Sequence, residues 1–268
     1  MKTEILAGLS AQERGIIGRL ASTERVAFGP EDLIAIHSCA RPTANKILSR
    51  LCRKGWLHRL KYGAYTIVPI SSTVAEPIVE DAWPLAMEVF KPAFISGWSA
   101  AEHWDMTEQI FNSISVVTTS VQRGTMQRIG NISFRVRTVP QSRFFGSKKV
   151  WFGSKAVQIA DPSRMIVDIL DLPRLGGGGR HTVDIVTQYW QSDQRDGALL
   201  LDYAIRYRRG SVFKRLGFLA EQLGAPVTGE WLISCQSHIS KGITALDPDG
   251  SKKGKIISKW GLKVNIPL

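Results

Sequence analysis

The sequence has only three cysteines among 268 residues, at positions 39, 52 and 235. Three scattered cysteines exclude a disulfide framework and a cysteine-based tetrahedral zinc site. No apolar run approaches the roughly 18 residues that a membrane-spanning helix needs. The N-terminal segment MKTEILAGLSAQER also lacks the apolar stretch of a signal peptide. We therefore expect a soluble, reduced, cytoplasmic protein without a membrane partner.

Acidic residues are few relative to basic ones. The 23 Asp and Glu against 35 Lys and Arg leave a formal net charge of +12. Residues 1–70 contain 11 basic and five acidic side chains, so about a quarter of the chain has half of the excess. Residues 41–61 contain seven basic side chains and no acidic one. This balance favours an anionic partner, and the position of the charge favours nucleic acid.

The pattern of residues 1–70 predicts three short helices followed by a β-hairpin. Ser10 and Glu13 have the spacing of a capping box at the start of the first helix. Pro30 opens the second helix, and the third extends over residues 42–54 with one apolar face. Two strand-like runs around a turn with glycine predict a hairpin over residues 56–68.

A break in the pattern after the hairpin predicts a domain boundary. Pro69 and the run SSTVAEP place it at residues 70–78, which gives domains 1–70 and 78–268. In the second domain, strand-like segments lie at residues 114–118, 132–136, 150–152 and 157–159. The cap signal Asp161-Pro162-Ser163 then starts a helix, further helical segments follow residue 180, and a possible strand lies at residues 261–266. Runs of strands followed by runs of helices indicate an α+β fold rather than a doubly wound one.

The order helix, turn, basic helix and hairpin is that of a winged helix-turn-helix. The polar N-terminal half of the third helix can reach base edges in the major groove, and basic side chains beyond it suit phosphates. The alternative interpretation of this basic helix is a solvated surface on a small helical domain that does not bind nucleic acid. The predicted base contacts are Arg41, Thr43, Asn45 and Lys46, and the predicted phosphate contacts are Arg50, Arg53, Arg59, Lys61 and Tyr62.

The segment RPTANKILSRLCRKGWLHRLKYGAYTIVP resembles the N-terminal winged-helix segment of the AbiEi-type antitoxins of type IV toxin–antitoxin (abortive infection) systems. FISGWSAAEHWDMTEQIFNSISVVTT resembles the opening of that family's C-terminal antitoxin domain. VQIADPSRMIVDIL and, more loosely, ALDPDGSKKGKIISKWGLKVNI are similar to later family segments. The Gly-rich bridge at residues 175–180 and the long helical block after it depart from the family pattern.

This resemblance implies a winged helix-turn-helix followed by a larger mixed α+β antitoxin domain, without enzymatic activity. It also implies an autorepressor that binds double-stranded DNA at inverted repeats in its own promoter. The functional partner would be a nucleotidyltransferase-like toxin, which the antitoxin counters without a stable complex.

A metal-dependent nuclease is the main enzymatic alternative. None of the 23 acidic residues has a lysine two positions downstream, and the five histidines form no HxH or HxxxH pair. Ser99, Glu102 and His103 lie within one helical stretch that Ser96 can cap, and no oxyanion feature accompanies them. The glycines at 176–179 lack a following Gly-Lys-Ser/Thr, so we interpret them as a flexible connection. We expect no catalytic residue, metal or cofactor.

Two further basic clusters leave two interpretations open. They form either a solubilising surface or an electropositive face that contacts DNA or RNA. A third function class also remains, a winged-helix repressor whose second domain senses a ligand or forms dimers. The clusters are Arg206, Arg208, Arg209, Lys214 and Arg215, and Lys241, Lys252, Lys253, Lys255, Lys259 and Lys263.

Overall fold

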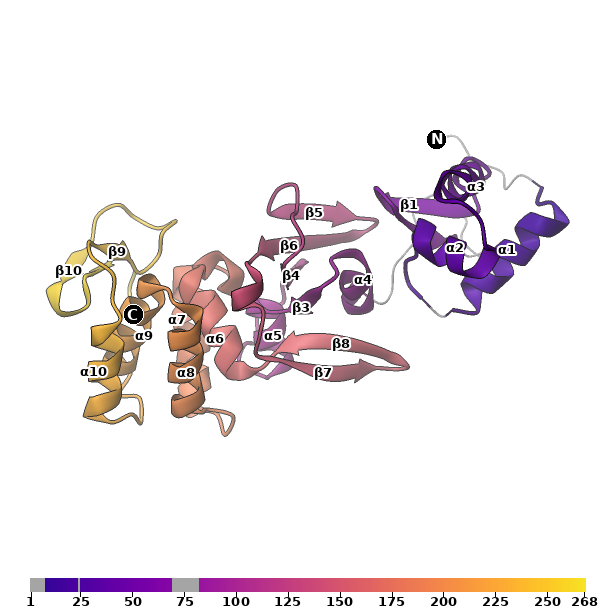
Figure 1. Cartoon of the computed structure of the whole chain (residues 1–268). Coiled ribbons are helices and arrows are strands. Elements are labelled where there is room, and N and C mark those ends of the chain that lie inside the picture. Colours follow the sequence, from indigo (N-terminus) through magenta and orange to yellow (C-terminus); the bar gives the residue numbers. More distant parts are fainter. Residues whose placement is uncertain (1–7, 24, 69–81) are drawn as a thin grey trace. The chain divides into compact units, whose positions relative to one another are not determined.

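The computed structural model describes residues 8–23, 25–68 and 82–268. The chain is a mixed α+β protein, as the order of the sequence patterns predicted (Figure 1). It divides into two compact units, residues 1–91 with 126–134 and residues 92–125 with 135–268. The expected domain boundary at residues 70–78 lies outside the described residues.

The first unit begins with three short helices and a hairpin, which confirms the elements predicted for this segment. Ser10 Oγ accepts from the Glu13 N–H, and the Glu13 carboxylate accepts from the Ser10 N–H, so the predicted capping box is present. Gly63 closes the hairpin turn with a φ of +75°, a conformation that costs glycine little. The elements are α1 (Ala11–Ala21), α2 (Pro30–His37), α3 (Arg41–Arg53), β1 (Leu57–Lys61) and β2 (Ala64–Ile67).

A small apolar core fixes the hairpin beside the helices. Leu33 of α2 and Leu48 and Leu51 of α3 are fully buried in this core, together with residues of α1 and both strands. The backbones of Phe28 and Tyr65 exchange two hydrogen bonds, which add a short third segment to the hairpin. Side chains on the outer surface of α3 and on the hairpin turn are therefore held on a rigid base.

A six-stranded sheet has the order β5-β6-β4-β3-β8-β7. Strand β3 pairs antiparallel with β4 and parallel with β8, and β7 and β8 form an antiparallel hairpin at one edge. The strands predicted around residues 114–118, 132–136, 150–152 and 157–159 are confirmed. The bounds are β3 (Ala93–Ile95), β4 (Ser113–Thr118), β5 (Met126–Ile129), β6 (Ile132–Thr138), β7 (Ser147–Phe152) and β8 (Lys155–Ala160).

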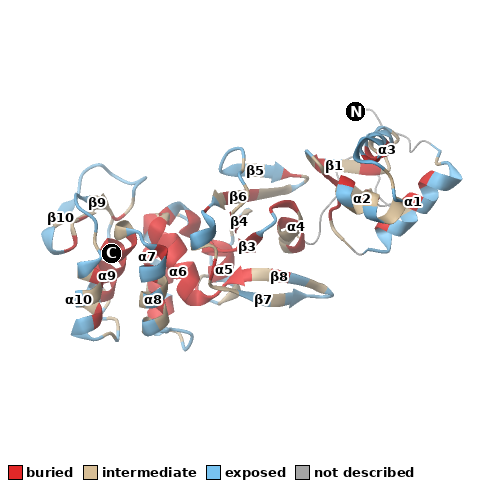
Figure 2. Cartoon of the chain, in the orientation of Figure 1, coloured by how far each residue is buried: buried red, intermediate tan, exposed pale blue. Residues whose placement is uncertain are grey.

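Helix α6 (Pro162–Asp171) is the centre of the second unit. Asp161 caps it by accepting from the Arg164 N–H, as its position before Pro162 predicted. Every residue of α6 is buried (Figure 2). It packs against α5 (Gly97–His103), α7 (Gly179–Gln191), α8 (Gly197–Tyr207) and α9 (Gly210–Gln222).

The remaining elements follow the predicted helical block. Helix α10 (Gly229–Ser237) packs on α9, and the strand expected near residues 261–266 is present as β11. The other elements were not predicted: α4 (Ala82–Val89), β9 (Thr244–Ala245), β10 (Lys255–Ile257), and the 3-10 helices η1 (Gln141–Arg143), η2 (Pro173–Gly176) and η3 (Ser258–Trp260). Strand β11 (Leu262–Val264) pairs antiparallel with β10 and parallel with β9.

Candidate nucleic-acid interface

Helix α3 has one apolar face and one polar face. Ala44, Ile47, Leu48 and Leu51 recur at helical spacing and are buried in the small core. The opposite face is exposed and has no acidic residue. Its side chains are Arg41, Thr43, Asn45, Lys46, Ser49, Arg50 and Arg53.

Two of these arginines have acidic partners that the sequence pattern did not predict. Arg41 forms an ion pair with Glu31 of α2, and both side chains are about two-thirds exposed. Arg50 Nε lies 3.0 Å from the carboxylate of Glu13, which is buried. Exposed pairs such as Arg41–Glu31 are worth about 0–1 kcal/mol, so a phosphate can replace the glutamate at little cost.

Glu13 joins α1 to the C-terminal end of α3. Its carboxylate also lies 2.7 Å from Lys54 Nζ, in addition to the capping contact with Ser10. The hydrogen bond from Lys54 and the Ser10 N–H together hold the pKa of Glu13 at about 2. The carboxylate therefore stays charged and connects the start of α1 to the C-terminal end of α3 through Arg50 and Lys54.

The hairpin turn presents an aromatic and cationic group next to α3. The Arg59 guanidinium lies 5.3 Å from the Tyr62 ring centroid and 5.9 Å from that of Tyr65. Tyr62 is 90% exposed, whereas Tyr65 is buried. Lys61 is half-buried because its side chain turns towards α4, where its Nζ donates to the Val89 carbonyl. This burial lowers the pKa of Lys61. Arg59 and Tyr62 thus project outward, and Lys61 does not.

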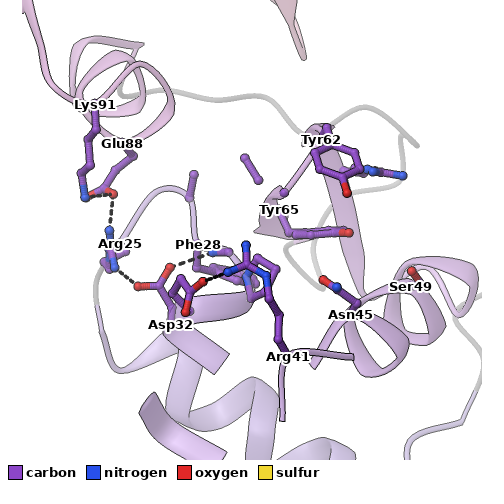
Figure 3. Close-up of a pocket in the computed structure, with 17 residues that line it drawn as sticks. Arg25, Phe28, Asp32, Arg41, Asn45, Ser49, Tyr62, Tyr65, Glu88 and Lys91 are labelled. Carbon is purple, nitrogen blue, oxygen red and sulfur yellow. Dashed lines mark hydrogen bonds and ion pairs between the residues drawn. The ribbon is translucent and has the colours of Figure 1, made fainter. Parts of the chain in front are cut away.

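A hollow of about 730 Å³ lies between α3 and the hairpin. Figure 3 shows Arg41, Asn45 and Ser49 on one side of it, with Tyr62 and Tyr65 across from them. Arg59 also lines it, and Glu31, Asp32, Glu88 and Lys91 add charges of both signs.

The structure brings some predicted residues together and leaves others apart. Those that line the hollow are Arg41, Asn45, Arg59 and Tyr62, whereas Thr43, Lys46, Arg50, Arg53 and Lys61 lie outside it. Sequence analysis did not select Ser49 or Tyr65 as site residues. Ser49 lies four residues after Asn45, so helical periodicity alone already put it on the same face.

The basic cluster at the junction of α8 and α9 is not a continuous exposed surface, so the interpretation of its five side chains as one electropositive face is wrong. Lys214 and Arg215 are buried, and burial lowers the pKa of Arg215 to about 10. Lys214 donates to the Gly242 carbonyl, and Arg215 donates to the carbonyls of Leu170, Ala245 and Leu246. These two cations therefore connect α9 to α6 and to residues 242–246. The tail lysines are exposed except Lys263, which is half-buried, and Lys259 forms an ion pair with Glu221.

The glycines at 176–179 form a close-packed turn, so the predicted flexible connection is wrong. A Cβ at Gly177 would lie 2.6 Å from the Phe111 ring, and one at Gly179 would lie 2.4 Å from Asp247. The Asp247 carboxylate accepts from the Gly179 N–H at the start of α7. An aspartate thus already occupies the position that a phosphate would take.

The serines near α5 have structural partners. Ser96 precedes the helix as predicted, but its hydroxyl donates to Asp168 rather than capping α5. Ser99 Oγ accepts from the Ser115 N–H at 3.0 Å. Burial lowers the pKa of His103, whose ring packs near Trp104 and Phe152. This arrangement positions α5 against β4 and the core.

Within residues 8–23, 25–68 and 82–268, no helix is long and apolar enough to cross a bilayer. Nor do three or more His, Cys, Asp or Glu side chains gather there in a geometry that fits a metal ion. Cys39, Cys52 and Cys235 form no disulfide.

Comparison with known proteins identifies a similar fold. No family model matches the sequence, and no curated protein matches it. A crystal structure of the RV2827C protein from Mycobacterium tuberculosis is similar, with a TM-score of 0.61 and 16% sequence identity. The similarity covers 97% of this chain and 93% of that one. At this level of identity, the likeness concerns the fold.

Proposed function

We propose that this chain is a non-enzymatic DNA-binding protein whose residues 1–70 form a winged helix-turn-helix. Helix α3 enters the major groove, and the β1–β2 hairpin is the wing that contacts the adjacent backbone. The observation on which this rests is the outward face of α3, which is exposed, free of acidic residues and next to Arg59 and Tyr62 of the hairpin. Helices with this composition fit the major groove.

Base reading falls to the N-terminal half of α3. Asn45 and Lys46 are exposed on the first turns, where recognition helices contact base edges, and can pair with adenine and guanine. Thr43 lies two residues before Asn45 and suits a thymine methyl group or a phosphate. Arg53 and Arg59 lie farther along the helix and on the hairpin, where they suit phosphates.

The wider proposal is that the protein represses its own promoter and is the antitoxin of a type IV toxin–antitoxin system. The support is the resemblance of residues 41–69, 94–119 and 157–170 to successive segments of the AbiEi-type antitoxins. On this proposal the DNA is an inverted repeat upstream of its own gene. The toxin is nucleotidyltransferase-like, and the antitoxin counters it without a stable complex.

A gel-shift titration against the protein's own upstream DNA, with scrambled competitor, tests the DNA-binding function. We expect specific binding at nanomolar protein, and the double variant Asn45→Ala/Lys46→Ala should lose about 1–3 kcal/mol for each base contact removed. The matched control is Arg180→Ala, which removes an exposed positive charge from α7. Equal losses on specific and scrambled DNA would show that α3 does not read bases.

Co-expression with a nucleotidyltransferase-like toxin, whose gene this proposal expects next to this one, tests the antitoxin function. The wild-type chain should restore growth in cells that express the toxin. A ligand-sensing repressor would instead change its DNA affinity with a metabolite and leave toxicity unaltered. Mg²⁺-dependent turnover of nucleic acid, abolished by a carboxylate substitution, would identify an enzyme and overturn the proposal.

A further inference from the structure

The antiparallel hairpin of β7 and β8 forms one edge of the six-stranded sheet. Its strands are paired from Ser147–Ala160 to Phe152–Lys155, and Gly153-Ser154 forms the turn. Gly153 has a φ of +58°, and a Cβ built on it would meet no atom within 4 Å. The tip is therefore accessible to a large ligand.

An exposed tryptophan lies near this tip. All eight tryptophans fall in the described part of the chain, and Trp151 alone among them is exposed, at 64%. Its cross-strand partner is Ala156, which is too small to cover an indole ring. The next residue, Phe152, is 39% exposed on the opposite face of the hairpin. Each face of the tip thus presents an aromatic ring.

Positive charge surrounds these rings. Residues 144–160 include Lys148, Lys149 and Lys155 and no acidic residue. The Lys149 ammonium lies 4.2 Å from the Trp151 ring centroid, on the same face. An exposed ring with a neighbouring cation is the combination that single-strand binding uses, because the ring stacks on a base and the cation contacts the backbone phosphate.

We propose that the β7–β8 hairpin binds single-stranded nucleic acid, with an unpaired base stacked on Trp151 and its phosphate contacted by Lys149. Duplex DNA is a poor ligand for this site, because its bases are already stacked and its exterior is phosphate and sugar. The tip has few polar groups that could read base edges, so binding is tolerant of sequence. This activity is separate from the duplex binding proposed for α3.

Other occupants fit the hairpin less well. A lipid surface requires apolar side chains on one face, whereas Trp151 and Phe152 point to opposite faces. Strand β7 is also a sheet edge, at which a second copy of the chain could add a strand. Lys148 and Lys149 on β7 oppose that pairing, because two copies would bring like charges together.

Fluorescence anisotropy of the full chain with short labelled oligo(dT) and oligo(rU) strands tests the proposal. Trp151→Ala should weaken binding about tenfold, within the range measured for one stacked base, and Trp151→Phe should retain most of the affinity. Lys149→Gln should reduce the slope of log affinity against log salt concentration by about 0.7. The control is Ile233→Ala, since Ile233 on α10 is 65% exposed and should bind like the wild type.

Similar affinity for both strands supports stacking with no role for the sugar, and a preference for oligo(rU) supports stacking with a contact to the 2′-hydroxyl. Wild-type affinity in Trp151→Ala would overturn the proposal. The proposal would also be overturned if Trp151→Ala changed only the sedimentation of the protein or only its binding to anionic vesicles. Asn45→Ala/Lys46→Ala should leave single-strand binding intact. Failure of the duplex-binding proposal can therefore be distinguished from failure of this one.

Discussion

At the scale of single residues, the buried ion pair of α6 is the strongest test of the fold. Arg164 contacts Asp168 at 3.0 and 2.9 Å, both side chains are fully buried, and Ser96 donates to the same carboxylate. Asp168→Asn leaves the guanidinium charge buried without its counter-charge. We expect a loss of about 3–5 kcal/mol in the free energy of unfolding, measured by denaturant titration.

A matched control separates this effect from charge removal in general. Asp184 of α7 is 62% exposed, and Asp184→Asn should change the free energy of unfolding by less than about 0.5 kcal/mol. The Arg164 guanidinium also lies 5.3, 4.6 and 5.0 Å from the ring centroids of Phe94, Phe145 and Tyr207. If Asp168→Asn were as mild as this control, these rings would be sufficient to stabilise the buried cation.

Glu13 gives a pH dependence with a definite sign. Its pKa in the folded protein is about 2, below the ordinary glutamate value of about 4.3. A lowered folded-state pKa stabilises the protein above the unfolded value, and this contribution disappears as the pH falls from about 4.3 through 2. Glu13→Gln should therefore cost about 1–3 kcal/mol at pH 7 and progressively less on acidification.

Thermal or denaturant unfolding of both proteins across this pH range measures the effect. Glu108→Gln, at an exposed position, is the control and should match the wild type throughout. A difference between Glu13→Gln and wild type that stays constant between pH 7 and 2.5 would show that the carboxylate's contacts to Lys54 and Ser10 do not contribute through its charge.

At the scale of secondary-structure elements, two helical glycines should respond to alanine with opposite signs. Gly217 of α9 lies against Trp260, and a Cβ there would come within 2.1 Å of the buried indole ring. Gly18 of α1 has no atom within 4 Å of the same position. Gly217→Ala should destabilise by about 1–3 kcal/mol, and Gly18→Ala should stabilise by about 0.5–1 kcal/mol.

Melting temperatures of the two variants decide this prediction. Helix propensity by itself would stabilise both variants. A rise in melting temperature for Gly217→Ala would mean that Trp260 can move away from α9 without loss of stability.

Helices with clear end signals were predictable, and short elements were not. Ser10 with Glu13, Pro30, and Asp161 before Pro162 each marked a helix start that the structure confirms. Strand β3 has three residues and β9 has two, which is too short for a period to be recognised. Their place is set by pairing with distant strands, which a local pattern does not contain.

Some features of the candidate site were also predictable and others were not. The helical period put Asn45, Ser49 and Arg53 on the outer face of α3, because residues that are not on the buried face lie on the opposite one. The ion pairs Glu13–Arg50 and Glu31–Arg41 join different helices, so only tertiary packing brings them together. The same is true of the burial of Lys214 and Arg215, which a count of charges treats as surface.

At the scale of the whole molecule, net charge overstates the surface available to an anion. Part of the excess of +12 comes from Arg164, Lys214 and Arg215, which are buried. Exposed basic side chains include those on the outer face of α3, Lys148 and Lys149 of the β7–β8 hairpin, Arg206, Arg208 and Arg209 near the end of α8, and most lysines of the C-terminal tail. Of these groups, the outer face of α3 is the one proposed to contact duplex DNA.

The salt dependence of DNA affinity tests that view. If about six to ten phosphates are contacted, affinity for the specific duplex should fall on the order of 10³–10⁵-fold between about 50 and 200 mM salt. Arg53→Gln and Arg59→Gln each remove one exposed cation and should each reduce the slope of log affinity against log salt by about 0.9. Asn45→Ala should weaken specific binding and leave the slope unchanged, because an uncharged side chain releases no counterion. A slope that Arg53→Gln and Arg59→Gln do not alter would place the phosphate contacts on another basic group, and substitution of the tail lysines would then be expected to lower it.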